Sequence, residues 1–200
     1  MSTESTSNRK DQLARAAFDL IAEVGIEGLR TRDVAARVGI NISTLHYYFP
    51  TKRDLIEGVA HLLGDIFYQQ HAEQPAESMS SLERLRQEFR DARANIEQRP
   101  DVMIVLYELV LLSRRHDVIV QMLEPLLAAW RGGIAEFLAE GVRDGTFRSD
   151  LDPDAGADFL VSTIWGASAL FSTDVTAVER ICAEIERSFT GIDYPVSDDT

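Results

Sequence analysis

The segment between Thr31 and Lys52 gathers side chains that are suited to contact nucleic acid. It supplies charged and neutral hydrogen-bond donors, adjacent aromatic rings and small hydroxyl groups, which are the groups that meet phosphates and base edges in duplex DNA. The members of this set are Arg32, Ile42, Ser43, Thr44, His46, Tyr47, Tyr48 and Lys52. Their chemistry is recognition of a polyanion rather than bond cleavage.

Residue patterns for catalysis and metal binding are weak by comparison. His61 and Asp65 have the i, i+4 spacing of two metal ligands on one helix face, but the sequence offers no third ligand beside them. Glycine-rich phosphate loops, the G-x-S-x-G nucleophile elbow and the H-E-x-x-H zinc motif do not occur. The sequence therefore predicts no catalytic residue, no cofactor and no metal site.

Two short helices must position the candidate DNA contacts. Apolar residues at helical spacing predict helices over 31–38 and 41–48, and Gly39 lies in the turn between them. The residues placed to hold the two helices together are Val34, Ala35, Val38, Ile40 and Leu45. Helix, tight turn and second helix form the layout of a helix-turn-helix DNA reader.

The rest of the chain shows the same helical periodicity, and no alternating strand pattern of useful length occurs. We expect an all-α protein of about nine helices. The apolar face of the first helix runs from Leu13 to Val24, and Gly25 ends the helix because glycine adopts positive φ freely. Pro125 interrupts the seventh helix and predicts a kink or a break there.

Charge divides the chain into two parts of different character. The sequence of 200 residues has 20 Lys and Arg, 33 Asp and Glu, and a formal net charge of −13. Residues 1–56 hold 8 of the basic and 7 of the acidic residues, a net charge of +1, which leaves −14 for residues 57–200. Contact with a polyanion therefore belongs to the first part. We expect a DNA-binding domain over 1–56 and an effector-binding and dimerisation domain over 57–200.

Composition also indicates where the protein works. The longest apolar run, Val102 to Leu112, is interrupted by Glu108 and is too short to span a bilayer. The amino end lacks the apolar region of a secretory signal, and the single cysteine, Cys182, cannot form an intramolecular disulfide. We expect a cytoplasmic protein that does not bind membranes.

The order GLRTRDVAARVGINISTLHYYFPTKRDLI, from Gly28 to Ile56, strongly resembles the TetR family of transcriptional regulators, and the helix LARAAFDLIAEVG precedes it. The resemblance implies that Thr31 caps the second helix and Asn41 the recognition helix. It places phosphate contacts at Thr31, Tyr48 and Lys52, and base contacts at Arg32, Ile42, Ser43, Thr44 and Tyr47. His46 stands where the family usually has tyrosine, which is a departure at a phosphate contact.

Beyond residue 56 the resemblance is architectural, and it implies dimerisation and effector binding. The last two helices resemble a pair that forms a four-helix dimer interface, here through Phe159, Ile164, Ala167, Phe171, Ile181, Ile185 and Phe189. The middle helices would enclose an effector pocket lined by Phe67, Phe89, Met103, Tyr107, Glu108, Met122, Trp130 and Trp165. Glu108 has two interpretations. Pointing inward it would favour a cationic or hydrogen-bond-donating ligand, and pointing outward it would be a solvated charge.

These features predict a homodimeric, ligand-responsive regulator, specifically a repressor that a small-molecule effector releases from a pseudo-palindromic operator in duplex DNA. An activator would need the same residues. The alternative from a different class is a helical small-molecule-binding protein or enzyme that keeps a non-functional helix-turn-helix. Salt-dependent binding to duplex DNA separates the two classes, because phosphate contacts release counterions.

Overall fold

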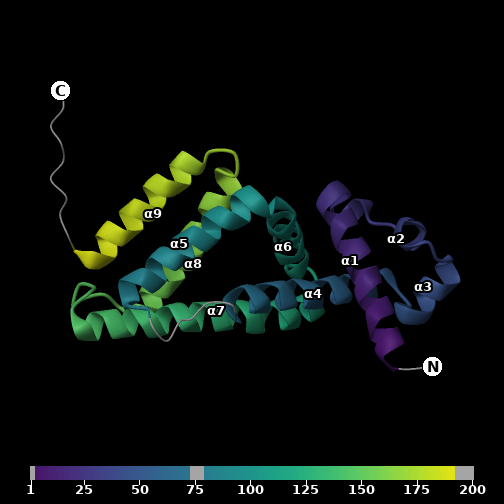
Figure 1. Cartoon of the computed structure of the whole chain (residues 1–200), viewed down its shortest axis with the longest axis horizontal. Coiled ribbons are helices and arrows are strands. Elements are labelled where there is room, and N and C mark those ends of the chain that lie inside the picture. Colours follow the sequence, from purple (N-terminus) through teal and green to yellow (C-terminus); the bar gives the residue numbers. More distant parts are fainter. Residues whose placement is uncertain (1–2, 73–78, 192–200) are drawn as a thin grey trace. The chain divides into compact units, whose positions relative to one another are not determined.

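The computed structural model describes residues 3–72 and 79–191, and this part of the chain contains nine helices and no strand (Figure 1). The helices are α1 (Thr3–Gly28), α2 (Thr31–Val38), α3 (Ile42–Tyr48), α4 (Lys52–Ala72), α5 (Ser81–Gln98), α6 (Pro100–Ser113), α7 (Asp117–Asp144), α8 (Pro153–Leu170) and α9 (Val175–Thr190). The predicted all-α class is confirmed.

The described residues pack as two compact units, and neither unit is one continuous stretch of chain. Among these residues, the first unit takes 3–72 and 100–126, and the second takes 79–99 and 127–191. Helix α6 and the first part of α7 therefore belong with α1 to α4, whereas α5 belongs with α8 and α9. The domain boundary expected after residue 56 separates a DNA-binding part from an effector-binding part. It does not coincide with the division into packed units, and it stays a prediction.

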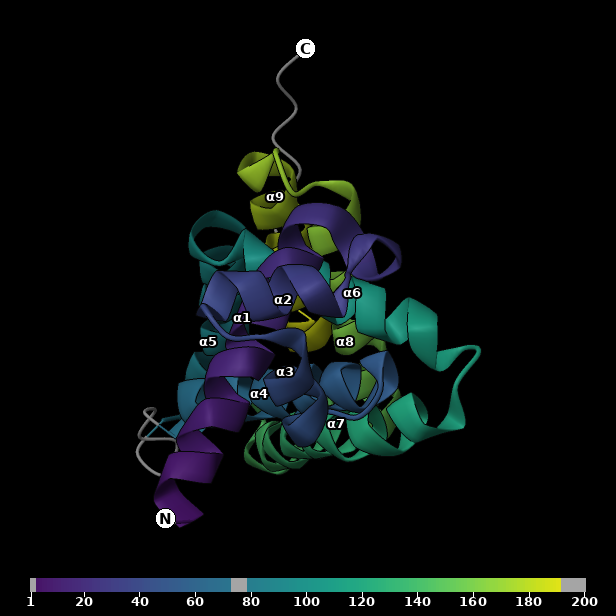
Figure 2. The same ribbon diagram turned by 90° about the vertical axis from the view of Figure 1, so that its right-hand side faces the viewer.

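The core of the first unit forms where α1 packs against α2, α4 and α6 (Figure 2). Its largest fully buried side chains are Leu13, Phe18, Ile21, Leu29, Leu45, Leu55, Leu63, Leu109 and Ile119. Val24 was expected on the buried face of α1, but it is 53% exposed. Its side chain lies against Gly28, which has no side chain of its own to cover it.

Gly25 breaks α1 at the position where the sequence predicts that the helix ends. Its φ of 71° and ψ of 168° lie in a region of backbone conformation that is essentially restricted to glycine. Beyond this break the chain makes one further helical turn to Gly28, and the N–H of Leu29 donates to the carbonyl of Gly25 at 3.2 Å. At this break the backbone N–H and carbonyl of Ile26 form hydrogen bonds with side chains from outside α1.

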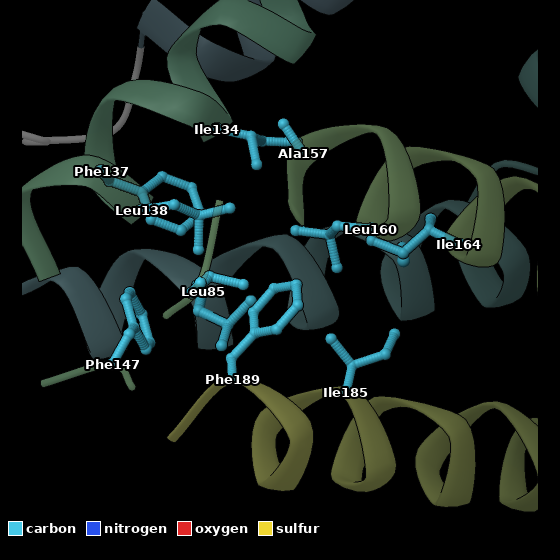
Figure 3. Close-up of a cluster of buried hydrophobic side chains, with 12 residues drawn as sticks. Leu85, Ile134, Phe137, Leu138, Phe147, Ala157, Leu160, Ile164, Ile185 and Phe189 are labelled. Carbon is cyan, nitrogen blue, oxygen red and sulfur yellow. The ribbon is translucent and has the colours of Figure 1, made fainter. Parts of the chain in front are cut away.

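The second unit closes around a cluster of aliphatic and aromatic side chains from α5, α7, α8 and α9 (Figure 3). The rings of Phe147 and Phe189 meet edge to face within it, with centroids 6.3 Å apart. Ion pairs join the same helices at the surface: Arg86 of α5 binds Glu186 of α9 at 2.6 Å, and Arg131 of α7 binds Asp158 of α8. Both apolar packing and charge pairing therefore hold α5 and α9 together.

Helix α7 passes through Pro125 without ending. The structure shows one helix from Asp117 to Asp144 with the proline inside it, so the break offered as one outcome for this position is wrong. Proline removes one backbone hydrogen bond and crowds the preceding turn. Buried residues on both sides, Ile119 and Ile134, anchor the two halves of the helix in their cores.

Candidate nucleic-acid interface

A tight turn joins α2 to α3, and glycine permits its backbone. Gly39 has φ 72° and ψ 32°, in the left-handed region. The N–H groups of Gly39 and Ile40 donate to carbonyls in the last turn of α2, at 3.1 and 3.0 Å. This arrangement satisfies the end of one helix while it reverses the chain into the next.

Asn41 caps α3, as the family resemblance implied. Its Oδ1 accepts from the N–H of Thr44 at 2.8 Å and from the hydroxyl of Thr44 at 3.0 Å. The cap implied at Thr31 does not form, because Thr31 is already the first residue of α2 and Arg30 occupies the N-cap position. Arg30 has extended backbone angles of −123° and 130° and makes no side-chain cap hydrogen bond.

The inner faces of α2 and α3 fix the position of both helices. Val34, Ala35 and Leu45 are buried, and α2 packs on both α1 and α3. At the end of α3 the N–H of Phe49 donates to the carbonyl of Leu45 at 2.8 Å. The Phe49 ring lies so close to Gly58 of α4 that a Cβ there would be 2.9 Å from it. The recognition helix is thus anchored at its middle and at its end.

The opposite face of α3 is open to solvent. Ile42 is 42% exposed and Tyr47 is 78% exposed, while Ser43 and His46 are exposed beside them. Thr44 and Tyr48 are half-buried, and the rings of Tyr47 and Tyr48 meet edge to face at 5.1 Å. A short helix that buries one face and presents polar and aromatic groups on the other has the form of a helix that reads a DNA groove.

Two further residues predicted to contact DNA lie on the helices that precede and follow α3 in the chain. Arg32 is exposed on α2 and pairs with its neighbour Asp33 at 3.4 Å. Lys52 begins α4, and its Nζ donates to the carbonyl of Ile26 at 2.7 Å. An ammonium group carries three donors, so this bond leaves Lys52 with donors for a phosphate.

Glu108 of α6 takes a position that neither sequence interpretation anticipated. Its Oε2 accepts from the backbone N–H of Ile26 at 3.1 Å. Its other carboxylate oxygen would be 3.3 Å from a Cβ on Gly25. Together with Lys52, Glu108 therefore holds both polar backbone groups of Ile26 beside the break in α1. These bonds tie α4 and α6 to the helix that supports α2.

We expect Glu108→Ala to lower the free energy of unfolding by about 1–2 kcal/mol, because it leaves the Ile26 N–H without its partner at a half-buried position. Glu108→Gln keeps an oxygen acceptor at the same place, so it should lose less than half as much. Urea unfolding followed by far-UV circular dichroism measures both. Equal stability of the alanine variant and the parent would show that the bond contributes nothing.

The predicted effector-pocket residues are divided between the two units. Phe67, Met103, Tyr107, Glu108 and Met122 belong to the first unit, and Phe89, Trp130 and Trp165 to the second; all are half-buried. Phe89 and Trp130 pack against the core of the second unit, and the Trp130 Nε1–H donates to Glu88 at 2.8 Å. Their assembly into one pocket stays a prediction.

The predicted dimer-interface residues fall into two groups. Ile164, Ala167, Ile185 and Phe189 are covered within a single chain, with exposed fractions of 2% to 7%, and Ile181 packs against the same clusters. Their apolar faces already pack on α5, α8 and α9 of the same chain, and their part in a dimer interface stays a prediction. Phe159 is 48% exposed and Phe171 is 38% exposed, so both side chains remain accessible to a second copy of the chain.

The outer face of α8 carries the predicted interface residue Phe159 among other small and apolar residues. Exposed or half-buried positions recur along it at a spacing of three or four: Ala155, Phe159, Ser162, Gly166 and Ala169. A Cβ built on Gly166 would have no atom within 4 Å. Leu170, beside this stripe, is 78% exposed. We call the five residues the α8 stripe.

The described residues offer little for metal binding or thiol chemistry. No three His, Cys, Asp or Glu side chains there gather closely enough to hold a metal ion. Burial raises the pKa of the Cys182 thiol to about 11, so it stays protonated at neutral pH. None of the described helices is long and apolar enough to cross a membrane.

The fold and the exposed recognition helix define a helix-turn-helix transcriptional regulator. The family model described as "Bacterial regulatory proteins, tetR family" matches residues 13–59, which span the supporting helix, the turn and the start of α4. In this region the chain matches the TetR family.

Relatives extend the likeness beyond the DNA-binding helices. The HTH-type transcriptional repressor KstR2 of Mycolicibacterium smegmatis is 29% identical over 161 residues, which cover 80% of this chain and 77% of that protein. The class A tetracycline repressor of Escherichia coli is 38% identical over 58 residues, covering 29% of this chain and 27% of that protein.

Solved structures share the fold. The ketosteroid transcriptional regulator KstR2 of Mycobacterium tuberculosis superposes with a TM-score of 0.70 at 21% identity, over 91% of this chain and 95% of that one. A transcriptional regulator from Saccharomonospora viridis, solved with choline, gives a TM-score of 0.78 at 24% identity, over 90% of this chain and 94% of that one.

Proposed function

We propose that this regulator is a cytoplasmic homodimeric repressor that binds a pseudo-palindromic operator through α2 and α3 and is released by a small-molecule effector. The observation that carries the proposal is the recognition helix: α3 is capped by Asn41, anchored by Leu45 and Phe49, and exposed at Ile42, Ser43, His46 and Tyr47. The repressor name of its KstR2 relatives supports the direction of regulation.

DNA contact is assigned to residues on one surface of the first unit. Thr31 and Arg32 on α2, the exposed residues of α3, Tyr48 and Lys52 supply donors and aromatic surfaces for phosphates and base edges. In a dimer the two recognition helices must lie about 34–36 Å apart to enter successive major grooves. The operator would therefore have two related half-sites in inverted orientation.

The effector is proposed to be a small molecule with an apolar body, because the candidate pocket residues are large and mostly apolar or aromatic. Helix α6 offers a route by which effector binding could change the affinity for DNA. It carries Met103 and Tyr107, and its Glu108 holds the backbone of Ile26 at the break in α1. Suppose that α6 has one position in the DNA-binding conformation and another in a conformation that does not bind DNA. An effector that binds the second conformation more tightly would lower operator affinity, by at most the ratio of its affinities for the two conformations.

Selection of genomic DNA fragments by the purified protein tests this function. We expect enrichment of a small set of fragments that share an inverted repeat, and the neighbouring genes would indicate the chemical class of the effector. Recovery of random fragments with no common sequence would contradict an operator-specific regulator.

A further inference from the structure

His46 is held by the loop that follows its own helix. It is exposed on α3, one turn beyond Ile42 and Ser43, and its Nδ1 lies 3.1 Å from the carbonyl oxygen of Pro50. A carbonyl oxygen only accepts hydrogen bonds, so Nδ1 must carry the hydrogen in this contact. The contact therefore selects the tautomer of the ring.

This tautomer decides what the other ring nitrogen can bind. A neutral imidazole has one N–H, and His46 uses it on Pro50. Nε2 then carries a lone pair, and it points away from Nδ1 on the far side of the ring. Phosphate oxygens in DNA only accept, so they cannot bind this lone pair. The imidazolium form has a second N–H at Nε2 and can donate it to a phosphate.

We propose that His46 is a proton-coupled phosphate-binding residue: it contacts the DNA backbone through Nε2–H, only as the imidazolium, so that binding of duplex DNA is accompanied by uptake of a proton. The inference rests on the proposed function, because it requires α3 to meet DNA. It adds a dependence of DNA affinity on pH to that function.

The acidic groups on the elements next to α3 already have partners. Helix α2 packs on α3 and carries Arg32, Asp33 and Arg37, and the start of α4, beyond Pro50, carries Lys52, Arg53, Asp54 and Glu57. Asp33 pairs with Arg32 at 3.4 Å, Glu57 pairs with Arg53 at 3.6 Å, and Asp54 accepts from the N–H and hydroxyl of Thr51. Arg37 pairs with Glu23 at 2.9 Å. A DNA phosphate would then be the anion that stabilises the imidazolium.

The test uses the full chain, a duplex of mixed sequence and constant salt, because a phosphate contact does not depend on base sequence. We expect the affinity of the parent to rise about fivefold per His46 between about pH 8 and about pH 6. His46→Phe should remove this rise. His46→Gln places a neutral amide donor near the Nε2 position, so it should bind more tightly than the phenylalanine variant and without the pH dependence.

His61→Gln and His116→Gln are the matched controls, since both residues lie outside α3 and should leave the rise in affinity unchanged. The proposal is overturned if the parent and His46→Phe bind the duplex with the same pH dependence. Failure of the parent to bind any duplex at either pH would instead refute the proposed function, and the inference with it.

Discussion

Gly166→Glu should convert the protein into a folded monomer whose affinity for its operator is about a hundredfold lower. Gly166 lies in the middle of the α8 stripe, and a Cβ at this position meets no atom within 4 Å in one chain. The monomer therefore has room for the new side chain, and glutamate is a better helix former than glycine. In a dimer packed through the α8 stripe, two carboxylates would enter a close apolar contact, which costs desolvation and repulsion.

Light scattering and far-UV circular dichroism should show a monomer with unchanged helix content, and fluorescence anisotropy should show the loss of operator affinity. Gly133→Glu is the matched control, because Gly133 is also an open helical glycine, on α7. It should remain dimeric. A dimeric Gly166→Glu protein with parental affinity would rule out the α8 stripe as the interface. The buried Ala167, 5% exposed, could not give this test because a charge there would disturb folding itself.

Gly141→Ala should destabilise the second unit by about 3 kcal/mol, although alanine is the better helix former. A Cβ on Gly141 would lie 2.2 Å from one ring carbon of Phe147 and 2.9 Å from the Cβ of Ser81. Phe147 and Ser81 are 2% and 3% exposed, so neither can move away into solvent. Phe147 also donates its N–H to the carbonyl of Gly141 at 2.9 Å, which ties the ring's backbone to the crowded position.

Urea unfolding followed by tryptophan emission measures this loss, because both tryptophans, Trp130 and Trp165, lie in the second unit. Gly133→Ala provides the opposite expectation. Its added Cβ meets nothing within 4 Å, so only the gain in helix propensity remains and stability should rise by about 0.5–1 kcal/mol. If Gly141→Ala were as stable as the parent, the close packing of Phe147 on α7 would be wrong.

The features that sequence could predict are local ones. Gly39 in the turn, Asn41 at the start of α3 and buried Leu45 follow from residue type and spacing over a few positions, and they locate the candidate DNA surface. The Thr31 cap shows the limit even there, since the extended backbone of Arg30 sets the helix start one residue away from the implied position.

The features that sequence could not predict depend on tertiary packing. Glu108 and Ile26 are 82 positions apart, and only the packing of α6 on α1 brings them together. Helix α8 has two faces rich in small and apolar residues, one with Ala167 and one with Gly166. Periodicity cannot tell which of them α5 and α9 will cover. The same ambiguity explains why four of the seven residues predicted for the dimer interface are buried within one chain.

The salt dependence of operator binding tests the central claim that α2 and α3 read duplex DNA. The measurement is the association constant for a selected duplex over a range of salt concentrations at fixed pH, for the parent and for Lys52→Ala. A plot of log affinity against log salt should fall with a slope of about −5 or steeper, and Lys52→Ala should make the slope shallower by about one for each protomer. A protein of net charge −13 has no other source of such a slope than a local cationic surface. Absence of duplex binding, or binding that does not change with salt, would contradict the account.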